Sequence, residues 1–111
     1  MNPNDALVIL CTAPSSDVAA TLARGLVDAQ LAACVNLIAG VRSFYRWKGE
    51  VEDDSEVQLV VKTRASRLAA VRGWIESNHP YDTPEILALP VSGGSEAYLA
   101  WIGQQVSAED I

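Results

Sequence analysis

The stretch VRSFYRWKGEVEDDSEVQLVVKT, at positions 41–63, decides the fold of this chain. Alternate residues of 41–47 would share one face of a strand, and the residues between them would share the other. Gly49 marks a turn, because glycine takes a positive φ at little cost. Alternation resumes over 57–61, where the apolar residues return to one face. We therefore predict one long β-hairpin.

The arms of this hairpin are longer than a compact domain of this size should be wide. A first arm running over residues 36–47 would span roughly 40 Å at about 3.3 Å per residue. Typical strands reach only about 17–20 Å, and a compact chain of 111 residues should measure roughly 34 Å across. The hairpin should therefore overhang its own domain, and another copy of the chain would cover its unpaired edge and aromatic side chains.

The composition bounds the class of protein. The 111 residues are enough for one domain, which we expect to span residues 1–111. A net charge of −6 argues against binding to nucleic acid or to an anionic membrane surface, which would need a basic patch. The N-terminal segment lacks the pattern of a signal peptide, so we expect a cytoplasmic protein with two reduced cysteines.

The rest of the chain supplies strands and helices around the hairpin. Before the hairpin we predict an apolar strand at 6–12 and a helix that is capped by Ser15 or Ser16 and ends by Ala29. After the hairpin we predict a helix that is capped by Ser66 and stopped by Pro80, then an apolar strand at 86–91 and a helix at 96–106. This order predicts an α+β fold, a ferredoxin-like βαββαβ sandwich with an extended central hairpin and a C-terminal helix.

Two glycines and the first strand carry more specific predictions. Gly25 inside the first helix indicates close packing there, because a helical glycine costs about 1 kcal/mol relative to alanine. Gly40 interrupts the alternation before the hairpin and predicts a bulge or bend. The continuous apolar run at 6–12 is typical of a central strand buried on both faces.

Cys11, with a soft thiol, and His79, with a basic imidazole, are the side chains that could bind a metal or take part in catalysis. Cys11 lies near the end of the first strand, shortly before a helix, whose dipole could lower the pKa of the thiol. From the residues alone we favour an inert cysteine of the core for Cys11, and more strongly for Cys34. His79 could cap the second helix, or act as a metal ligand or a general acid or base.

A second group of polar residues could line a small-molecule cleft between subunits. Its members are Tyr45, Lys62, Tyr81, Asp82 and Glu85. Tyr45 could instead be cross-strand packing, and Lys62 could pair with an acidic neighbour or remain solvated. The acidic run at 50–54 is typical of a solvated hairpin tip rather than a cation site.

Several segments together resemble the CutA divalent-cation-tolerance family. They are LCTAP at 10–14, LAACVN at 31–36, SFYRWKGEVE at 43–52, EVQLVVKT at 56–63 and HPYDTPE at 79–85, followed by Tyr98 and Trp101. They cover nearly the whole chain in order. The resemblance implies a ferredoxin-like subunit in a homotrimer whose hairpins pair between subunits, similar in fold and assembly to the P-II signalling proteins.

The same resemblance implies a metal-binding role. Members of the family are linked to tolerance of copper and other heavy metals, and copper binding is associated with the cysteine of LCTAP and a His-His pair. By position these correspond to Cys11 and His79, whereas Asn78 stands where the second histidine would fall. Asparagine is a weak copper ligand, so this departure predicts weaker copper binding or a different set of ligands.

Three interpretations follow. The first is a trimeric cytoplasmic protein, not an enzyme, that binds copper or another divalent metal through Cys11 and His79 and responds to metal ions. The second is a P-II-like signalling trimer that binds a small metabolite in a cleft between subunits. The third, which ranks last, is an enzyme with Cys11 as nucleophile and His79 as base, because no orienting residue or oxyanion motif is recognisable.

Overall fold

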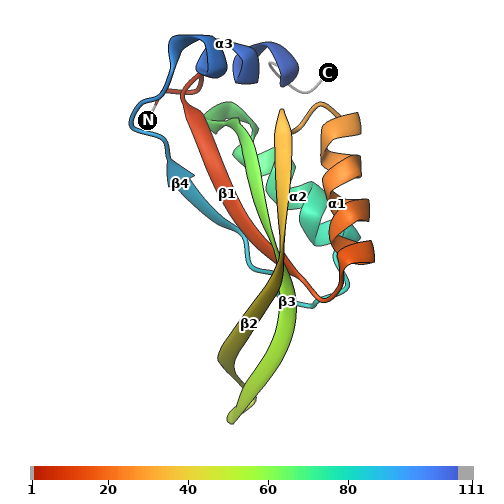
Figure 1. Cartoon of the computed structure of the whole chain (residues 1–111). Helices are drawn as coiled ribbons and strands as arrows, with labels where there is room; N and C mark the ends of the chain where they lie inside the picture. The colour runs from red at the N-terminus through yellow and green to blue at the C-terminus, as the bar shows by residue number, and fades with distance from the viewer. Residues whose placement is uncertain (1, 108–111) are drawn as a thin grey trace.

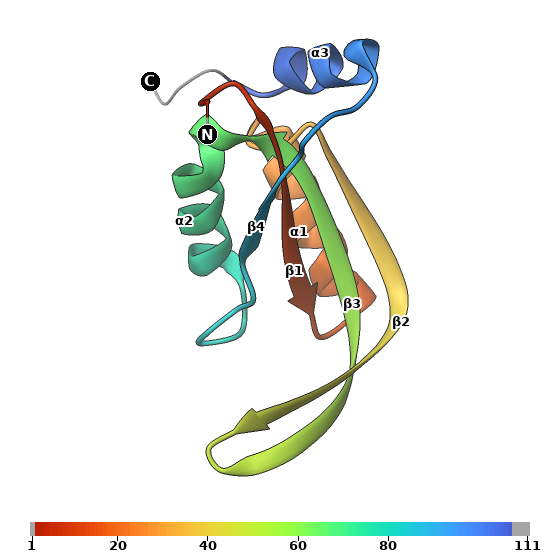
Figure 2. The ribbon, with the colours of Figure 1, turned by 90° about the vertical axis from the view of Figure 1, so that its left-hand side faces the viewer.

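The computed structural model describes residues 2–107, and it contains a four-stranded antiparallel sheet with the order β2-β3-β1-β4. The elements are β1 (Ala6–Ala13), α1 (Ser16–Asp28), β2 (Cys34–Trp47), β3 (Glu50–Arg64), a short 3-10 turn (Ala65–Arg67), α2 (Leu68–Asn78), β4 (Leu87–Pro90) and α3 (Glu96–Gln105). Helices α1 and α2 cover one face of the sheet, and α3 crosses its end (Figures 1 and 2). The predicted ferredoxin-like α+β fold is confirmed.

The hairpin overhangs the sheet, as its length predicts. Strand β3 has 15 residues and β1 only 8, and the pairing between them ends at Ala13 and Val57. From Glu56 to the tip, β3 pairs with β2 alone and the two strands curve away together (Figure 2). The radius of gyration is 14.4 Å and the longest extent 43 Å, against about 13 Å expected for the radius of a compact chain of this size.

The turn and the bulge of the hairpin lie where the glycines predict them. Lys48 and Gly49 have φ of 50° and 82°, which is the two-residue turn that matches the twist of paired strands. Gly40 has φ of 79°, and the register between β2 and β3 shifts between Ile38 and Val41. The bulge therefore separates the part of β2 over the sheet from the part that projects.

The core lies between the sheet and the two long helices. Alternate residues of β1 and β3, such as Ile9, Leu59 and Val61, are fully buried there, opposite Leu22 and Leu26 of α1. Ala6, Val8 and Leu10, which point to the other face of β1, are only half-buried, so the predicted burial on both faces is wrong for most of this strand in the single chain. Among the described residues, α3 covers only the end of that face, through Ile102 and Val106.

Three local predictions also need correction. The second helix begins after a 3-10 turn, with Arg67 at its N-cap position and no side-chain capping bond to the helix, so Ser66 is not its cap. The backbone of Ser66 instead donates to the Pro3 carbonyl, which draws the chain into the turn. Strand β4 is shorter than predicted and exposed throughout, because it lies at the edge of the sheet. Cys34 is half-buried rather than a core residue.

Other features agree with the sequence. Ser15 caps α1, with its hydroxyl accepting from the Val18 amide at 3.2 Å, and His79 ends α2 with extended backbone angles. The part of the chain that the structure describes contains no helix of the length and apolarity needed to span a membrane.

Substitution of Gly25 should show that α1 and α2 are packed to contact. A Cβ atom at this position would overlap the indole ring of Trp74, so we expect Gly25→Ala to lower the free energy of unfolding by about 1–3 kcal/mol. Gly73 in α2 is the matched control, because a Cβ there meets nothing within 4 Å. Gly73→Ala should raise stability by about 0.5–1 kcal/mol. Urea unfolding at one protein concentration measures both, and equal stabilisation by the two substitutions would contradict the close packing.

Candidate binding site at the base of the hairpin

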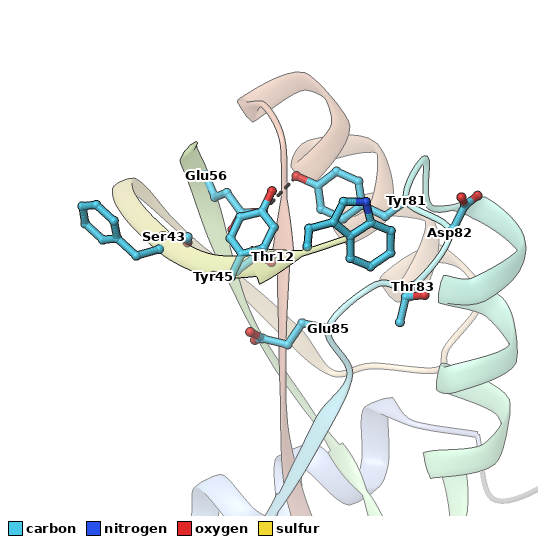
Figure 3. Close-up of a pocket in the computed structure, with 10 residues that line it drawn as sticks. Thr12, Ser43, Tyr45, Glu56, Tyr81, Asp82, Thr83 and Glu85 are labelled. Atoms are coloured by element: carbon cyan, nitrogen blue, oxygen red, sulfur yellow. Dashed lines mark hydrogen bonds between the residues drawn. The ribbon is translucent and has the colours of Figure 1, made fainter. Parts of the chain in front are cut away.

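The site lies where β1 ends and the hairpin continues past it. The end of β1, the base of the hairpin and the loop between α2 and β4 enclose a cavity of ≈ 540 Å³ (Figure 3). The residues that line it are Thr12, Ser43, Phe44, Tyr45, Trp47, Glu56, Tyr81, Asp82, Thr83 and Glu85. Three segments that are distant in the sequence therefore contribute to one site.

His79 fixes the loop to the end of β1. Its ring is 8% exposed, with Nε2 at 2.8 Å from the carbonyl oxygen of Thr12 and Nδ1 at 3.1 Å from the amide nitrogen of Tyr81. A carbonyl only accepts and an amide N–H only donates, so Nε2 carries the proton and Nδ1 accepts. Both ring nitrogens are thus engaged within the chain. Pro80 follows at once and keeps His79 out of helical geometry.

Cys11 is fully buried, beside His79 but on the core side of β1. Its thiol donates to the carbonyl oxygen of Thr12 at 3.7 Å. Burial raises the pKa of the Cys11 thiol to about 12, and the negative charges of Glu85 and Glu56 act in the same direction. A lowering by the helix dipole is therefore wrong for Cys11, because desolvation and the nearby carboxylates outweigh it.

The thiol of Cys11 and the imidazole of His79 contact the same carbonyl oxygen, that of Thr12, within one chain. The direction of the elements explains this arrangement: β3 runs antiparallel to β1, and α2 runs back against β3. The C-terminal end of α2 therefore lies at the C-terminal end of β1.

The acidic and phenolic side chains at the cavity are linked in pairs. The hydroxyl of Tyr81 donates to Glu56 at 2.8 Å, and the hydroxyl of Tyr45 donates to Asp54. The hydrogen bond with Asp54 raises the pKa of Tyr45 to about 12. Burial, followed by the hydrogen bond with Glu56, raises the pKa of Tyr81 as well. These pairs tie the loop and the two hairpin strands together.

Four of the five residues predicted for a small-molecule cleft line this cavity: Tyr45, Tyr81, Asp82 and Glu85. The structure places Lys62 elsewhere. It pairs with Val8 in the body of the sheet, and its Nζ lies 5.9 Å from the centre of the Tyr98 ring. Asn78 is turned away too, because its side-chain amide donates to the Trp74 carbonyl of its own helix at 2.8 Å.

Sequence reasoning missed the roles of Thr12 and Glu56. Thr12 follows Cys11 directly, so its position at the strand end was a usable signal, but its carbonyl is a backbone group that no residue type reveals. Glu56 is the first residue of β3 beyond the pairing with β1. This position depends on where β1 stops, and the sequence pattern of β3 alone does not show where that is.

Cys11 and His79 supply a thiol and an imidazole, which suit soft or borderline metals such as copper and zinc. Within residues 2–107, no group of three or more His, Cys, Asp or Glu side chains is placed to hold a metal ion. The described residues therefore offer these two donors side by side at the Thr12 carbonyl and no third.

Comparisons with known proteins agree with this architecture. A family model described as CutA1 divalent ion tolerance protein matches residues 7–105. The divalent-cation tolerance protein CutA of Pectobacterium atrosepticum is 51% identical over 98 residues, which are 88% of this chain and 89% of that protein. A solved CutA1 from Thermus thermophilus has a TM-score of 0.90 and 43% identity, covering 92% of this chain and 99% of that chain.

Relatives can be longer than this chain. The chloroplastic CutA of Arabidopsis thaliana is 44% identical over 96 residues, which are 86% of this chain but 53% of that relative. The chain thus spans about half the length of the plant protein.

The raised pKa of Cys11 predicts a specific dependence of stability on pH. Below the ordinary thiol value of 9.0, Cys11 is protonated in both the folded and the unfolded state and contributes no slope. Between 9.0 and about 12 the unfolded state loses its proton first, so the free energy of unfolding should fall as pH rises. The contribution is at most about 1.4 kcal/mol per pH unit.

Denaturant unfolding at several pH values above 8 measures this slope. Cys11→Ala should make the fall in stability shallower, whereas Cys34→Ala, the matched control, should leave the slope of the parent unchanged. Equal slopes for the parent and Cys11→Ala would show that the thiol is not buried as described.

Proposed function

Because the chain belongs to the CutA1 divalent ion tolerance protein family, we propose that it binds copper and contributes to tolerance of metal ions without catalysing a reaction. The observation that carries this proposal is the convergence of Cys11 and His79 on the carbonyl of Thr12. A thiolate and an imidazole are preferred ligands of copper. The buried thiol argues against a nucleophilic role, since nucleophilic cysteines need an accessible thiolate.

Copper binding at this pair would change the hydrogen bonds described above. The thiol of Cys11 must give up its proton, and His79 must release either the carbonyl of Thr12 or the amide of Tyr81 to free a ring nitrogen. Metal affinity should therefore increase as pH rises towards the pKa of the thiol. The buried position of Cys11 would also keep the metal away from solvent.

Calorimetric titration of copper into the protein tests the two ligands. We expect Cys11→Ser to remove most of the affinity and His79→Ala a comparable share, because each deletes one donor of the pair. Cys34→Ser is the control, since it removes the other cysteine, which lies in β2 opposite Lys62 rather than at the site. Asn78→His should strengthen binding if a second histidine next to His79 contributes.

Titrations over a range of pH, with the assembly state checked for each variant, complete this test. If Cys11→Ser and His79→Ala both bind copper as the parent does, the metal site lies elsewhere.

We also propose that the chain assembles as a homotrimer. Large apolar side chains are exposed on the projecting hairpin and at both edges of the sheet: Leu37, Ile38, Phe44, Trp47, Val51, Leu87 and Leu89. Burial of such side chains between subunits is the usual reason for a surface of this kind. A trimer would also bring donors from neighbouring chains towards the two ligands of each subunit.

Light scattering should give three times the chain mass of 11.9 kDa. Trp47→Ala should weaken assembly by about 3–5 kcal/mol if its ring is buried between subunits. The weakening should appear as a mass that falls on dilution. Val27→Ala is the control, because Val27 is similarly exposed but lies on α1, away from the hairpin. A monomer at micromolar concentration, or an intact trimer of Trp47→Ala at every concentration, would contradict the proposal.

A second candidate function is binding of a small metabolite, as in a P-II-like signalling trimer. The cavity at the hairpin base favours it, because its volume of ≈ 540 Å³ falls within the range of small-molecule sites.

The cytoplasm is the proposed compartment, where Cys11 and Cys34 would remain reduced. Cell fractionation checks the compartment.

A further inference from the structure

The walls of the hairpin cavity are aromatic and acidic. Four aromatic side chains line it, namely Phe44, Tyr45, Trp47 and Tyr81, together with three carboxylates from Glu56, Asp82 and Glu85. None of the residues lining the cavity is a lysine, an arginine or a histidine. The whole chain carries a net charge of −6, so no distant excess of positive charge offsets these carboxylates.

The carboxylates differ in how far they are already engaged. Glu56 accepts the hydroxyl of Tyr81 and is held in the wall of the cavity. Asp82 and Glu85 come from the loop on the opposite side, and Figure 3 shows Glu85 below the Tyr45 ring and Asp82 at the far end of the site. No ion pair between described residues involves either of these two carboxylates. They are therefore free to accept hydrogen bonds from a ligand.

One organic cation of the hairpin, the guanidinium of Arg42, is already held by an aromatic ring and a carboxylate. The guanidinium of Arg42 lies 4.9 Å from the centre of the Phe44 ring and is clamped by two hydrogen bonds to Asp53, at 2.9 and 2.8 Å. Ring and carboxylate together thus satisfy one cation next to the cavity. Inside it, Tyr45 and Tyr81 offer rings, and Asp82 and Glu85 offer carboxylates, and none of the lining residues is a cation.

A bare metal ion is a poor match for this cavity. A hard divalent ion needs several oxygen ligands close together, but no cluster of three acidic, histidine or cysteine side chains in residues 2–107 could hold one. The aromatic rings would also be left unused by a hydrated ion. Rings and separated carboxylates are the combination that recognises ammonium and guanidinium groups on a carbon frame.

We propose that this cavity binds an organic cation, an amine or guanidine carried on a short apolar chain, with the rings of Tyr45 and Tyr81 against its carbon frame and the carboxylates of Asp82 and Glu85 accepting its N–H groups. This inference rests on the small-molecule cavity proposed above and names its ligand class. It is independent of copper binding at Cys11 and His79.

Calorimetric titration of the assembled, metal-free protein with a matched set of probes tests the ligand class. The set is putrescine, butanediol and succinate, which share a four-carbon chain but carry two ammonium groups, two hydroxyls or two carboxylates. We expect putrescine to bind at least about tenfold more tightly than butanediol and succinate, since only its ammonium groups can make charge-assisted hydrogen bonds to the carboxylates. Magnesium chloride at the same concentrations should bind at least about tenfold more weakly than putrescine.

Isosteric variants locate the binding. Glu85→Gln and Asp82→Asn should each weaken putrescine binding about tenfold or more, and Tyr45→Leu should weaken it too. Glu76→Gln, an exposed position on α2 that does not line the cavity, removes the same charge and should leave the affinity within about twofold of the parent.

Several outcomes would overturn the inference. Butanediol or succinate binding as tightly as putrescine would retain a small-molecule site but exclude a cationic ligand class. Magnesium binding as tightly as putrescine would show that the cavity attracts cations through charge alone. Absence of putrescine binding at millimolar concentration, or equal losses in Glu76→Gln and Glu85→Gln, would exclude an amine site in this cavity.

Discussion

The unequal length of two paired strands is the constraint on which the rest of the structure depends. Strand β1 stops after 8 residues, whereas β3 continues for 15 and leaves the sheet with only β2 as its partner. Main-chain hydrogen bonds of the projecting part therefore come from the hairpin itself. The candidate site lies at this boundary because Thr12 ends one strand where Glu56 continues the other.

One backbone carbonyl organises the chemistry at that boundary. The oxygen of Thr12 accepts from both Cys11 and His79, so a strand end, a core cysteine and a helix end are joined at a single atom. The ring of His79 also packs at a tilt of 48° against that of Tyr81, with ring centres 4.7 Å apart, and Tyr81 reaches the hairpin through Glu56. The two ligands proposed for copper and the acidic cavity thus share one loop, and a change at His79 would be transmitted to the cavity wall through Tyr81.

Helices cover the main part of the sheet on one face only. Helices α1 and α2 bury the residues of β1 and β3 that face them, and the close approach of Gly25 to the Trp74 ring shows how tightly the helices pack. On the other side α3 covers the end, which leaves apolar residues exposed at both edges and along the hairpin. Exposed apolar surface of this extent is difficult to reconcile with a free monomer. Membership of the CutA1 family and the exposed hairpin therefore support the same proposal of assembly.

The sequence by itself determined the order of elements, the hairpin with its turn and its bulge at Gly40, the cap at Ser15 and the end of α2 before Pro80. These features depend on local backbone preferences and on periodicity, which residue types reveal directly. It also named Cys11, His79 and four of the residues around the cavity. Only the tertiary structure decided that Cys11 and His79 meet in one chain, that Lys62 lies apart, and that burial and nearby carboxylates raise the pKa of the thiol. Those outcomes depend on where β1 stops and on the direction in which α2 returns, and both are set by packing between segments distant in the sequence.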